Sequence, residues 1–286
     1  MINSHWRILA CDLDGTLIGW SHKVNERDLA ALRAARAAGI HVAICTGRNA
    51  GECAGVIAAL DLAGPGVFVN GAMVSDMNTG RTLQCRFMPG AIVDEAVDFF
   101  GNRNHAVLLL ADDPDTRVPL YFLTDHAPPH PDTTEWLAIN RMHARPVGEL
   151  PPSLRQRIVR LGIVSEVPEA KAIESAMESR FSGRAAHHSI YSPHYDCQVL
   201  EVFAAGTDKW TGITQMAPVV GVDPARVIAI GDDVNDLAML RGASLSFAMG
   251  NAKPHVRAHA RRVTGSHDEC GVAQVVEALL RGELEP

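Results

Sequence analysis

Residues 8–16 read ILACDLDGT, an apolar run followed at once by two carboxylates, a glycine and a threonine. The four apolar residues predict a short buried strand. Asp12 lies at its end, and the turn that Gly15 permits brings Asp14 within reach of the same place. Two carboxylates so placed can supply a nucleophile and a general acid or base. On its own, however, an Asp-x-Asp pair at a strand end is more often a solvated turn.

Three further apolar runs also end in small or polar residues. They are residues 42–45 before Thr46, 67–69 before Asn70 and 227–230 before Gly231. Residues 25–39 have an N-cap asparagine, an acidic first turn and a final glycine, which predict a helix between the first two strands. Alternating strands and helices predict an α/β fold, with a Rossmann-like parallel sheet that helices cover on both faces. Ligands bind such sheets at the carboxyl ends of the strands, where these polar residues fall.

The middle of the chain follows a different pattern. Residues 85–191 combine apolar strands, two helices and a proline- and histidine-rich loop. We expect this segment to form a separate α+β domain, inserted into an α/β core domain made of residues 1–84 and 192–286. The expected helices cover 90–100 and 169–180, the expected strands cover 107–110, 121–124, 158–164 and 186–191, and the loop covers 126–131.

Composition and charge narrow the classes of function. Of 286 residues, 47% are hydrophobic and 21% charged, as in ordinary globular proteins. The formal net charge is −7 and no basic run offers a stripe for phosphate backbones, so nucleic acid is not an expected partner. The apolar runs are much shorter than the roughly 20 residues of a membrane span, and no signal-peptide core precedes Asp12. We therefore expect a cytoplasmic protein without a membrane partner, and the sequence leaves its oligomeric state open.

Four sequence motifs occur along the chain in the order that is typical of one protein family. The chain resembles the haloacid dehalogenase superfamily, in particular the Cof-type phosphatases of subclass IIB, which carry a large α+β cap of the C2 type. A set of motifs at predicted strand ends and helix starts is far more specific than any one of them. The motifs are D-x-D-G-T at residues 12–16, Thr46-Gly47-Arg48, Lys209, and G-D-x-x-N-D at residues 231–236, with the trailing signatures of the branch at 248–252 and 271–273.

The resemblance implies a mechanism of phosphate ester hydrolysis. Asp12 would attack phosphorus and form an aspartyl-phosphate. Asp14, starting in its protonated form, would protonate the leaving alcohol and later activate the hydrolytic water. The inserted domain would act as a cap that excludes water and selects the substrate, with residues 128–136 as candidates for that selection.

The resemblance also implies the groups that bind metal and phosphate. A Mg²⁺ ion would be held by the Asp12 carboxylate, the Asp14 backbone carbonyl and Asp232. Thr46, the Gly47 amide and Lys209 would bind the phosphate. Asn235 and Asp236 would orient the metal ligands or Lys209.

Charge supports the need for a cation at this edge of the sheet. Two unit charges 4 Å apart cost about 4 kcal/mol at an effective dielectric of about 20. A converging set of carboxylates therefore requires compensation, for which a hard divalent cation with oxygen ligands is suited. The set that we expect to converge is Asp12, Asp14, Asp232, Asp233 and Asp236, although Asp233 is better explained as a solvated carboxylate at a helix start.

For three residues at the same edge of the sheet, the sequence is compatible with either a substrate contact or a structural role. Arg48, Asn70 and Gly71 could contact the leaving group of the substrate, but an arginine or an Asn-Gly turn there could equally be structural.

Three residues depart from the sequence pattern of the Cof-type phosphatases. Trp210 stands where glycine is usual, His267 where asparagine is frequent, and Cys270 where an acidic residue is usual. They put in question the space beside the substrate and the polar contacts behind the metal site.

Two other functions remain open at this point. A phosphotransferase or phosphomutase would pass the same aspartyl-phosphate to a hydroxyl group instead of water. A non-catalytic protein that binds a phosphorylated metabolite would be expected to have lost Asp12, Asp14 or Asp232, and all three are present. We therefore expect a Mg²⁺-dependent phosphatase of a small phosphorylated metabolite, such as a sugar phosphate or a cofactor phosphate.

Overall fold

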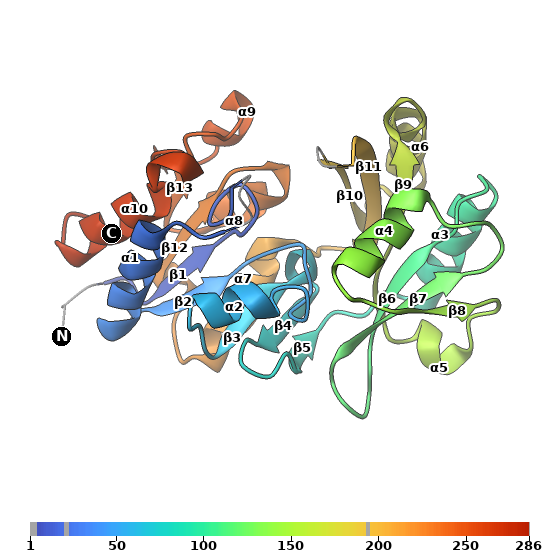
Figure 1. The fold of residues 1–286 in the computed structure, drawn as a ribbon, viewed down its shortest axis with the longest axis horizontal. Helices are drawn as coiled ribbons and strands as arrows, with labels where there is room; N and C mark the ends of the chain where they lie inside the picture. Colours follow the sequence, from blue (N-terminus) through green and yellow to red (C-terminus); the bar gives the residue numbers. More distant parts are fainter. Residues whose placement is uncertain (1–4, 20–22, 193–194, 286) are drawn as a thin grey trace. The chain divides into compact units, whose positions relative to one another are not determined.

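The computed structural model describes residues 5–19, 23–192 and 195–285 (Figure 1). The chain divides into two compact units, which we call the α/β unit and the inserted unit. The α/β unit comprises Met1–Gln84 and Asp208–Pro286, and the inserted unit comprises Cys85–Thr207.

A parallel five-stranded sheet forms the centre of the α/β unit, as the alternation of strands and helices predicted. Every strand pair in it is parallel. The register places Cys11, the last residue of β1, opposite both Ile44 and Ile230, so the neighbouring strands end at the same level. The sheet order is β14 (Arg262–Val263), β13 (Leu245–Ala248), β12 (Val227–Gly231), β1 (Ile8–Cys11) and β2 (His41–Ile44).

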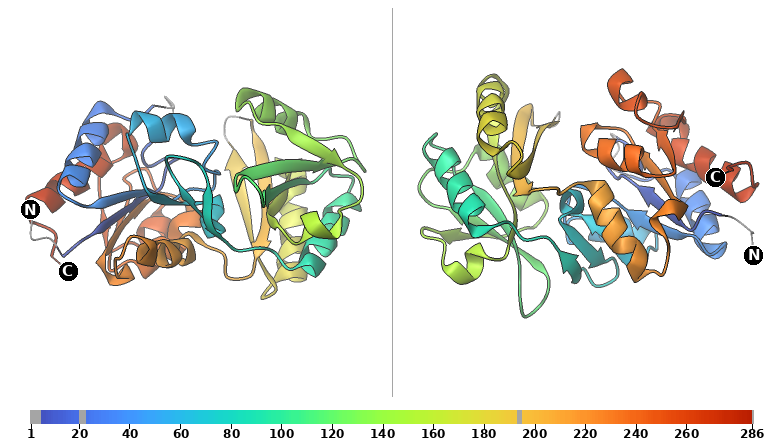
Figure 2. Two further views of the ribbon diagram at one scale, coloured as in Figure 1. Left: turned by 90° about the horizontal axis from the view of Figure 1, so that it is seen from below. Right: turned by 180° about the vertical axis from the view of Figure 1, so that it is seen from behind.

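Helices cover both faces of this sheet (Figure 2). Helices α1 (Glu26–Ala37) and α10 (Gly271–Leu280) lie on one face, and α7 (Lys209–Val219) and α8 (Leu237–Gly242) on the other. The side chain of Asn25 caps α1 by accepting a hydrogen bond from the Arg27 amide, as its sequence predicted. The buried Asp28 accepts a 2.7 Å hydrogen bond from the Ala273 amide and so joins α1 to the start of α10. Two short helices complete the unit, α2 (Ala54–Ala59) and α9 (Pro254–Arg257).

The apolar run 67–69 has a different place from the one expected. Strand β3 (Pro65–Phe68) pairs antiparallel with β4 (Met73–Asp76), in a three-stranded sheet with β5 (Thr82–Cys85). A single parallel bridge between Cys45 and Val67 links it to the end of β2. The run therefore forms a buried strand, as expected, but it meets the parallel sheet only at this bridge, and its regular pairing is with β4.

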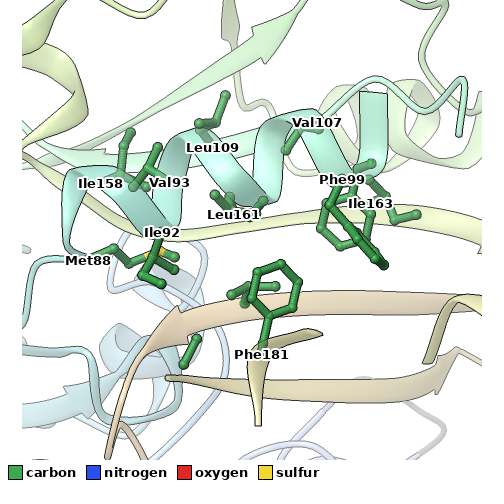
Figure 3. Close-up of a cluster of buried hydrophobic side chains, with 14 of the residues drawn as sticks. Met88, Ile92, Val93, Phe99, Val107, Leu109, Ile158, Leu161, Ile163 and Phe181 are labelled. Carbon is green, nitrogen blue, oxygen red and sulfur yellow. The ribbon is translucent and has the colours of Figure 1, made fainter. Parts of the chain in front are cut away.

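The inserted unit is an α+β fold around a mixed six-stranded sheet. Helices α3 (Gly90–Gly101) and α6 (Val167–Phe181) pack on one face of this sheet. Figure 3 shows part of the apolar core that these helices form with the sheet. Helices α4 (Pro131–Ile139) and α5 (Pro152–Arg155) are shorter. The sheet order is β10 (Ala185–Ser192), β11 (Cys197–Ala204), β9 (Ile158–Glu166), β6 (Leu108–Asp112), β7 (Pro119–Thr124) and β8 (Ala144–Val147).

The second boundary of the inserted unit differs from the predicted one. Strand β11 pairs along its length with both β10 and β9, so it belongs inside this sheet. The inserted unit therefore ends at Thr207 and not at residue 191. The prediction that residues 192–207 are part of the core domain was wrong. Strands β8 and β11 and helices α4 and α5 were absent from the prediction.

Across the described part of the chain, residues 5–19, 23–192 and 195–285, no helix combines the length and the apolar character that crossing a membrane requires.

Candidate active site

Asp12 and Asp14 follow β1 at the carboxyl edge of the parallel sheet. Asp12 is buried, whereas Asp14 is exposed. Between this pair and the next strand, Gly15 adopts a φ of +83°, which favours glycine. A Cβ atom at Gly15 would lie 2.2 Å from Oδ2 of Asp232, so this position has no room for a side chain. The close approach of the two loops therefore depends on Gly15.

Lys209 brings a buried positive charge to the two buried carboxylates of the site. Its Nζ donates to Oδ1 of Asp12 at 2.5 Å and to Oδ1 of Asp236 at 2.6 Å. Helix α7 begins at Lys209, and the side chain of Asp208 caps it through the Thr211 amide at 2.7 Å. Burial alone would lower the pKa of Lys209, but Asp12 and Asp236 raise it above its ordinary value, so Lys209 is charged.

Asp236 accepts three hydrogen bonds. Oδ1 of Asp236 accepts the hydrogen bond from Lys209. Its Oδ2 accepts hydrogen bonds from the backbone amides of Asp232 at 2.8 Å and Asp233 at 3.1 Å. Asp233 is the N-cap residue of a short 3₁₀ turn, Val234–Asp236, that precedes α8, which agrees with its interpretation as a helix-start carboxylate. Asp236 therefore organises the loop after β12.

Three carboxylates form a cluster with the chemistry of a divalent cation site. Oxygen atoms of Asp12, Asp232 and Asp236 lie within 4.8 Å of one another. Since Asp236 is already engaged by three donors, Asp12 and Asp232 are the members that can serve as ligands. Burial, and then the neighbouring Asp236, raise the pKa of Asp232 to about 7, and burial and Asp236 also raise that of Asp12. A hard cation with oxygen ligands, such as Mg²⁺, fits this donor set and would offset the repulsion.

The second motif lies beside the first. Thr46 is buried, and its Oγ1 accepts a hydrogen bond from the Arg48 amide at 3.2 Å. The side chain of Arg48 is turned to Asp14, with Nε donating to Oδ2 at 2.8 Å and a second nitrogen donating to Oδ1. Arg48 is thus paired with a predicted catalytic carboxylate.

Asn70 and Gly71 make close contacts within the protein. Asn70 is fully buried and accepts a hydrogen bond from Nδ2 of Asn235 at 3.2 Å. A Cβ atom at Gly47 would lie 3.1 Å from the side-chain Nδ2 of Asn70, so Asn70 packs against the second motif. A Cβ atom at Gly71, where φ is +95°, would lie 1.9 Å from the carbonyl oxygen of Asp208. Gly71 therefore allows the residue before Lys209 to approach this turn.

The structure shows the surroundings of the three residues that depart from the Cof-type pattern. The Trp210 ring packs against α8, where a Cβ atom at Gly242 would lie 2.3 Å from it. His267 contributes its backbone amide, which donates to Oδ1 of Asn251 at 3.1 Å, a contact that does not depend on its side chain. Cys270 occupies the residue before α10 with a φ of +57°.

Two residues that contact Asp232 were given no role by sequence reasoning. Thr16 donates to Oδ1 of Asp232 at 3.0 Å, and Asn251 donates to Oδ2 at 3.3 Å. Both lie inside recognised motifs, D-x-D-G-T and the signature at 248–252, so the motifs were the available signal.

The fold and this acidic site define a hydrolase of the haloacid dehalogenase-like class. A family model described as haloacid dehalogenase-like hydrolase matches residues 9–276, so the chain belongs to this family, as its motifs predicted.

Individual relatives cover almost the whole chain. The 5-amino-6-(5-phospho-D-ribitylamino)uracil phosphatase YitU of Bacillus subtilis is 28% identical over 94% of this chain and 96% of its own. The pyridoxal phosphate phosphatase YbhA of Escherichia coli is 25% identical over 96% of this chain and 98% of its own. Both of these relatives are named as phosphatases.

Solved structures share the fold. A haloacid dehalogenase-like hydrolase from Bacteroides thetaiotaomicron superposes with a TM-score of 0.76 at 22% identity, covering 96% of this chain and 99% of its own. The subclass IIB sugar phosphatase BT4131 superposes with a TM-score of 0.76 at 20% identity, covering 97% of this chain and 100% of its own.

Proposed function

We propose that the chain is a Mg²⁺-dependent phosphatase that hydrolyses a small phosphorylated metabolite through an aspartyl-phosphate on Asp12. The observation that carries this proposal is the buried contact between Asp12 and Lys209, at 2.5 Å, beside the carboxylate of Asp232. A nucleophilic carboxylate must approach an anionic phosphate, and this requires fixed positive charge at the point of attack.

Asp12 and Asp14 share the chemistry in two steps. In the first, an oxygen of Asp12 bonds to phosphorus while the bond from phosphorus to the leaving oxygen breaks, and Asp14 gives that oxygen a proton. In the second, Asp14 takes a proton from water, which attacks phosphorus and releases phosphate from Asp12. Asp14 ends the cycle protonated again.

The remaining groups bind and orient the phosphate. We assign the phosphate oxygens to Thr46, the Gly47 amide and Lys209. We assign metal binding to Asp12, Asp232 and the backbone carbonyl of Asp14, where the ion, when bound, supplies positive charge against the phosphate. Asn235 and Asp236 would hold these groups in place.

The pair of Arg48 and Asp14 adds a requirement to this cycle. Both carboxylate oxygens of Asp14 accept hydrogen bonds from the guanidinium of Arg48. The carboxyl group of Asp14 can contact the leaving group only after Arg48 has moved away. An incoming phosphate, which offers Arg48 an alternative anionic partner, would release it.

The nature of the substrate is proposed at the level of its class. YitU is named for 5-amino-6-(5-phospho-D-ribitylamino)uracil and YbhA for pyridoxal phosphate. We propose a phosphate monoester of similar size, either a sugar phosphate or a cofactor phosphate, with the α/β unit as the catalytic domain and the inserted unit as the domain that selects the substrate.

Phosphate release from a generic aryl phosphate tests this function. We expect release that requires Mg²⁺ and is lost in Asp12→Asn, which keeps the shape of the side chain and removes its charge. Asp98→Asn, an exposed aspartate of α3, is the matched control and should retain activity. Metal-independent release, or release that survives in Asp12→Asn, would refute the proposal. Transfer of the phosphoryl group to an added alcohol without free phosphate would identify a phosphotransferase or phosphomutase instead, and phosphate ester binding without turnover would identify a binding protein.

A further inference from the structure

We propose that Asn251 is a positioning residue that holds the carboxylate of Asp232 in the orientation in which it binds the metal ion. This inference rests on the proposed Mg²⁺ site and concerns a residue to which no role has been assigned above. It follows from where Asn251 lies, how its amide is oriented, and what else touches Asp232.

The loop that carries Asn251 is fixed to the chain on two sides. The Met249 amide donates to the Gly231 carbonyl at 3.0 Å, and the Gly250 amide donates to the Gly265 carbonyl at 2.9 Å. A Cβ atom at Gly250 would lie 2.6 Å from the Ser266 nitrogen, so the two backbones are in direct contact there. The backbone of this loop therefore offers a rigid base for the side chain of Asn251.

The partners of the Asn251 amide determine which way it points. Its Oδ1 accepts a hydrogen bond from the His267 backbone N–H at 3.1 Å. A backbone N–H can only donate, so the atom facing it must be the amide oxygen. Its Nδ2 donates to the Gly15 carbonyl at 2.8 Å and to Oδ2 of Asp232 at 3.3 Å, and both of these are acceptors. Turning the amide over would oppose like groups at all three contacts, so Asn251 presents a donor to Asp232.

Asp232 is consequently held at both of its oxygens. Thr16 donates to Oδ1 at 3.0 Å and Asn251 donates to Oδ2, while each oxygen keeps lone pairs for a cation. Two donors restrict rotation of the carboxylate. The same Asn251 amide fixes Gly15, whose lack of a side chain makes room for Asp232, so one residue joins the two loops that supply the metal ligands.

Groups that orient metal ligands typically contribute about 10- to 100-fold to metal affinity. The contact from Asn251 to Asp232 is long and Asn251 is exposed, so we expect the lower end of this range. Loss of the contact should weaken metal binding while leaving the phosphate-binding groups Thr46 and Lys209 unchanged.

Titration calorimetry with Mg²⁺ alone tests the proposal, without substrate or turnover. We expect the dissociation constant of Mg²⁺ to rise about tenfold in Asn251→Ala. Asn102→Ala, an exposed asparagine at the end of α3, is the matched control and should bind as the unchanged protein does. At saturating Mg²⁺, we expect Asn251→Ala to recover most of its kcat with an unchanged KM for an aryl phosphate.

A purely structural role would give a different result. In that case Asn251→Ala would lower the melting temperature of the metal-free protein without changing the dissociation constant of Mg²⁺, which would overturn the proposal. Asn251→Ser, a smaller change, serves if the alanine variant does not fold, and the same increase in the dissociation constant is expected. If the unchanged protein does not bind Mg²⁺, the proposed function fails and this inference fails with it, whereas normal binding by both proteins refutes this inference alone.

Discussion

Lys209 donates a 2.5 Å hydrogen bond to Asp12, and both side chains are buried at the carboxyl edge of the parallel sheet. Helix α7 begins at Lys209 and β1 ends just before Asp12, so the contact joins two distant parts of the sequence. It places a fixed positive charge against the proposed nucleophile.

Replacing Lys209 with methionine should cost both stability and activity. The buried carboxylates of Asp12 and Asp236 would lose their shared cation, and breaking a buried ion pair on one side typically costs about 3 to 5 kcal/mol. Urea unfolding should show a decrease of this size in the free energy of unfolding, and phosphate release should be lost. Full activity in the methionine variant would mean that the positive charge is not needed at Asp12.

Stabilisation by Mg²⁺ should increase with pH. Burial, and then the neighbouring Asp236, raise the pKa of Asp232 to about 7, above its ordinary value. In the metal-free protein, the stability contributed by the protonated group is fully present below its ordinary pKa and is lost as the pH rises through about 7. The carboxylate that binds a cation is formed over the same interval, so the increase in melting temperature caused by Mg²⁺ should be larger at about pH 8 than at about pH 6.

Thermal unfolding with and without Mg²⁺ across this range is the measurement. Asp232→Asn lacks the titrating group and is the matched control, in which the dependence on pH should be much weaker. An equal effect of Mg²⁺ at both pH values in the unchanged protein would show that Asp232 does not control metal binding.

Gly71→Ala should disturb the start of α7. The new Cβ atom would lie 1.9 Å from the Asp208 carbonyl oxygen, at a φ of +95°, so the backbone that leads into Lys209 must move. We expect a loss of stability of roughly 3 kcal/mol from overpacking and backbone strain together, and a decrease in kcat. Gly80→Ala separates the two causes, because Gly80 has a φ of +69° with nothing within 4 Å of its Cβ position.

The control variant should lose only about 1 kcal/mol and keep its activity, since it adds strain without a clash. Chemical denaturation and phosphate release measure both quantities. Equal losses in the two variants would show that the contact of Gly71 with Asp208 contributes nothing.

The predicted edge of the sheet follows from features that a single sequence contains. Short apolar runs that end in Asp12, Thr46 and Gly231 mark parallel strands, and the register of β1 with β2 and β12 aligns their ends. The motifs that lie there could therefore be expected to meet. Lys209 could be expected there only from the resemblance, because nothing near it in the sequence indicates a buried lysine.

Other features depend on contacts between distant residues and could not be predicted. Strand β11 carries Glu201, which is buried and forms an ion pair with Arg160 of β9 at 3.0 Å. This charge interrupts the apolar pattern by which strands are recognised, so the sequence pattern alone predicts an end of the inserted unit before β11. The reversal after β3 could not be predicted from the run 67–69, because it uses a left-handed valine, Val69 with a φ of +54°, which is rare for a β-branched residue.

The central claim is that Asp12 carries the phosphoryl group during turnover. Rapid acid quenching of the enzyme with an aryl phosphate and Mg²⁺, followed by mass spectrometry of its peptides, tests it most directly. We predict that the peptide containing Asp12 gains the mass of one phosphoryl group. The modified fraction should increase in Asp14→Asn, because an aryl leaving group departs without a proton from residue 14 while water is no longer activated. Turnover at the normal rate with Asp12 unmodified throughout would contradict the account.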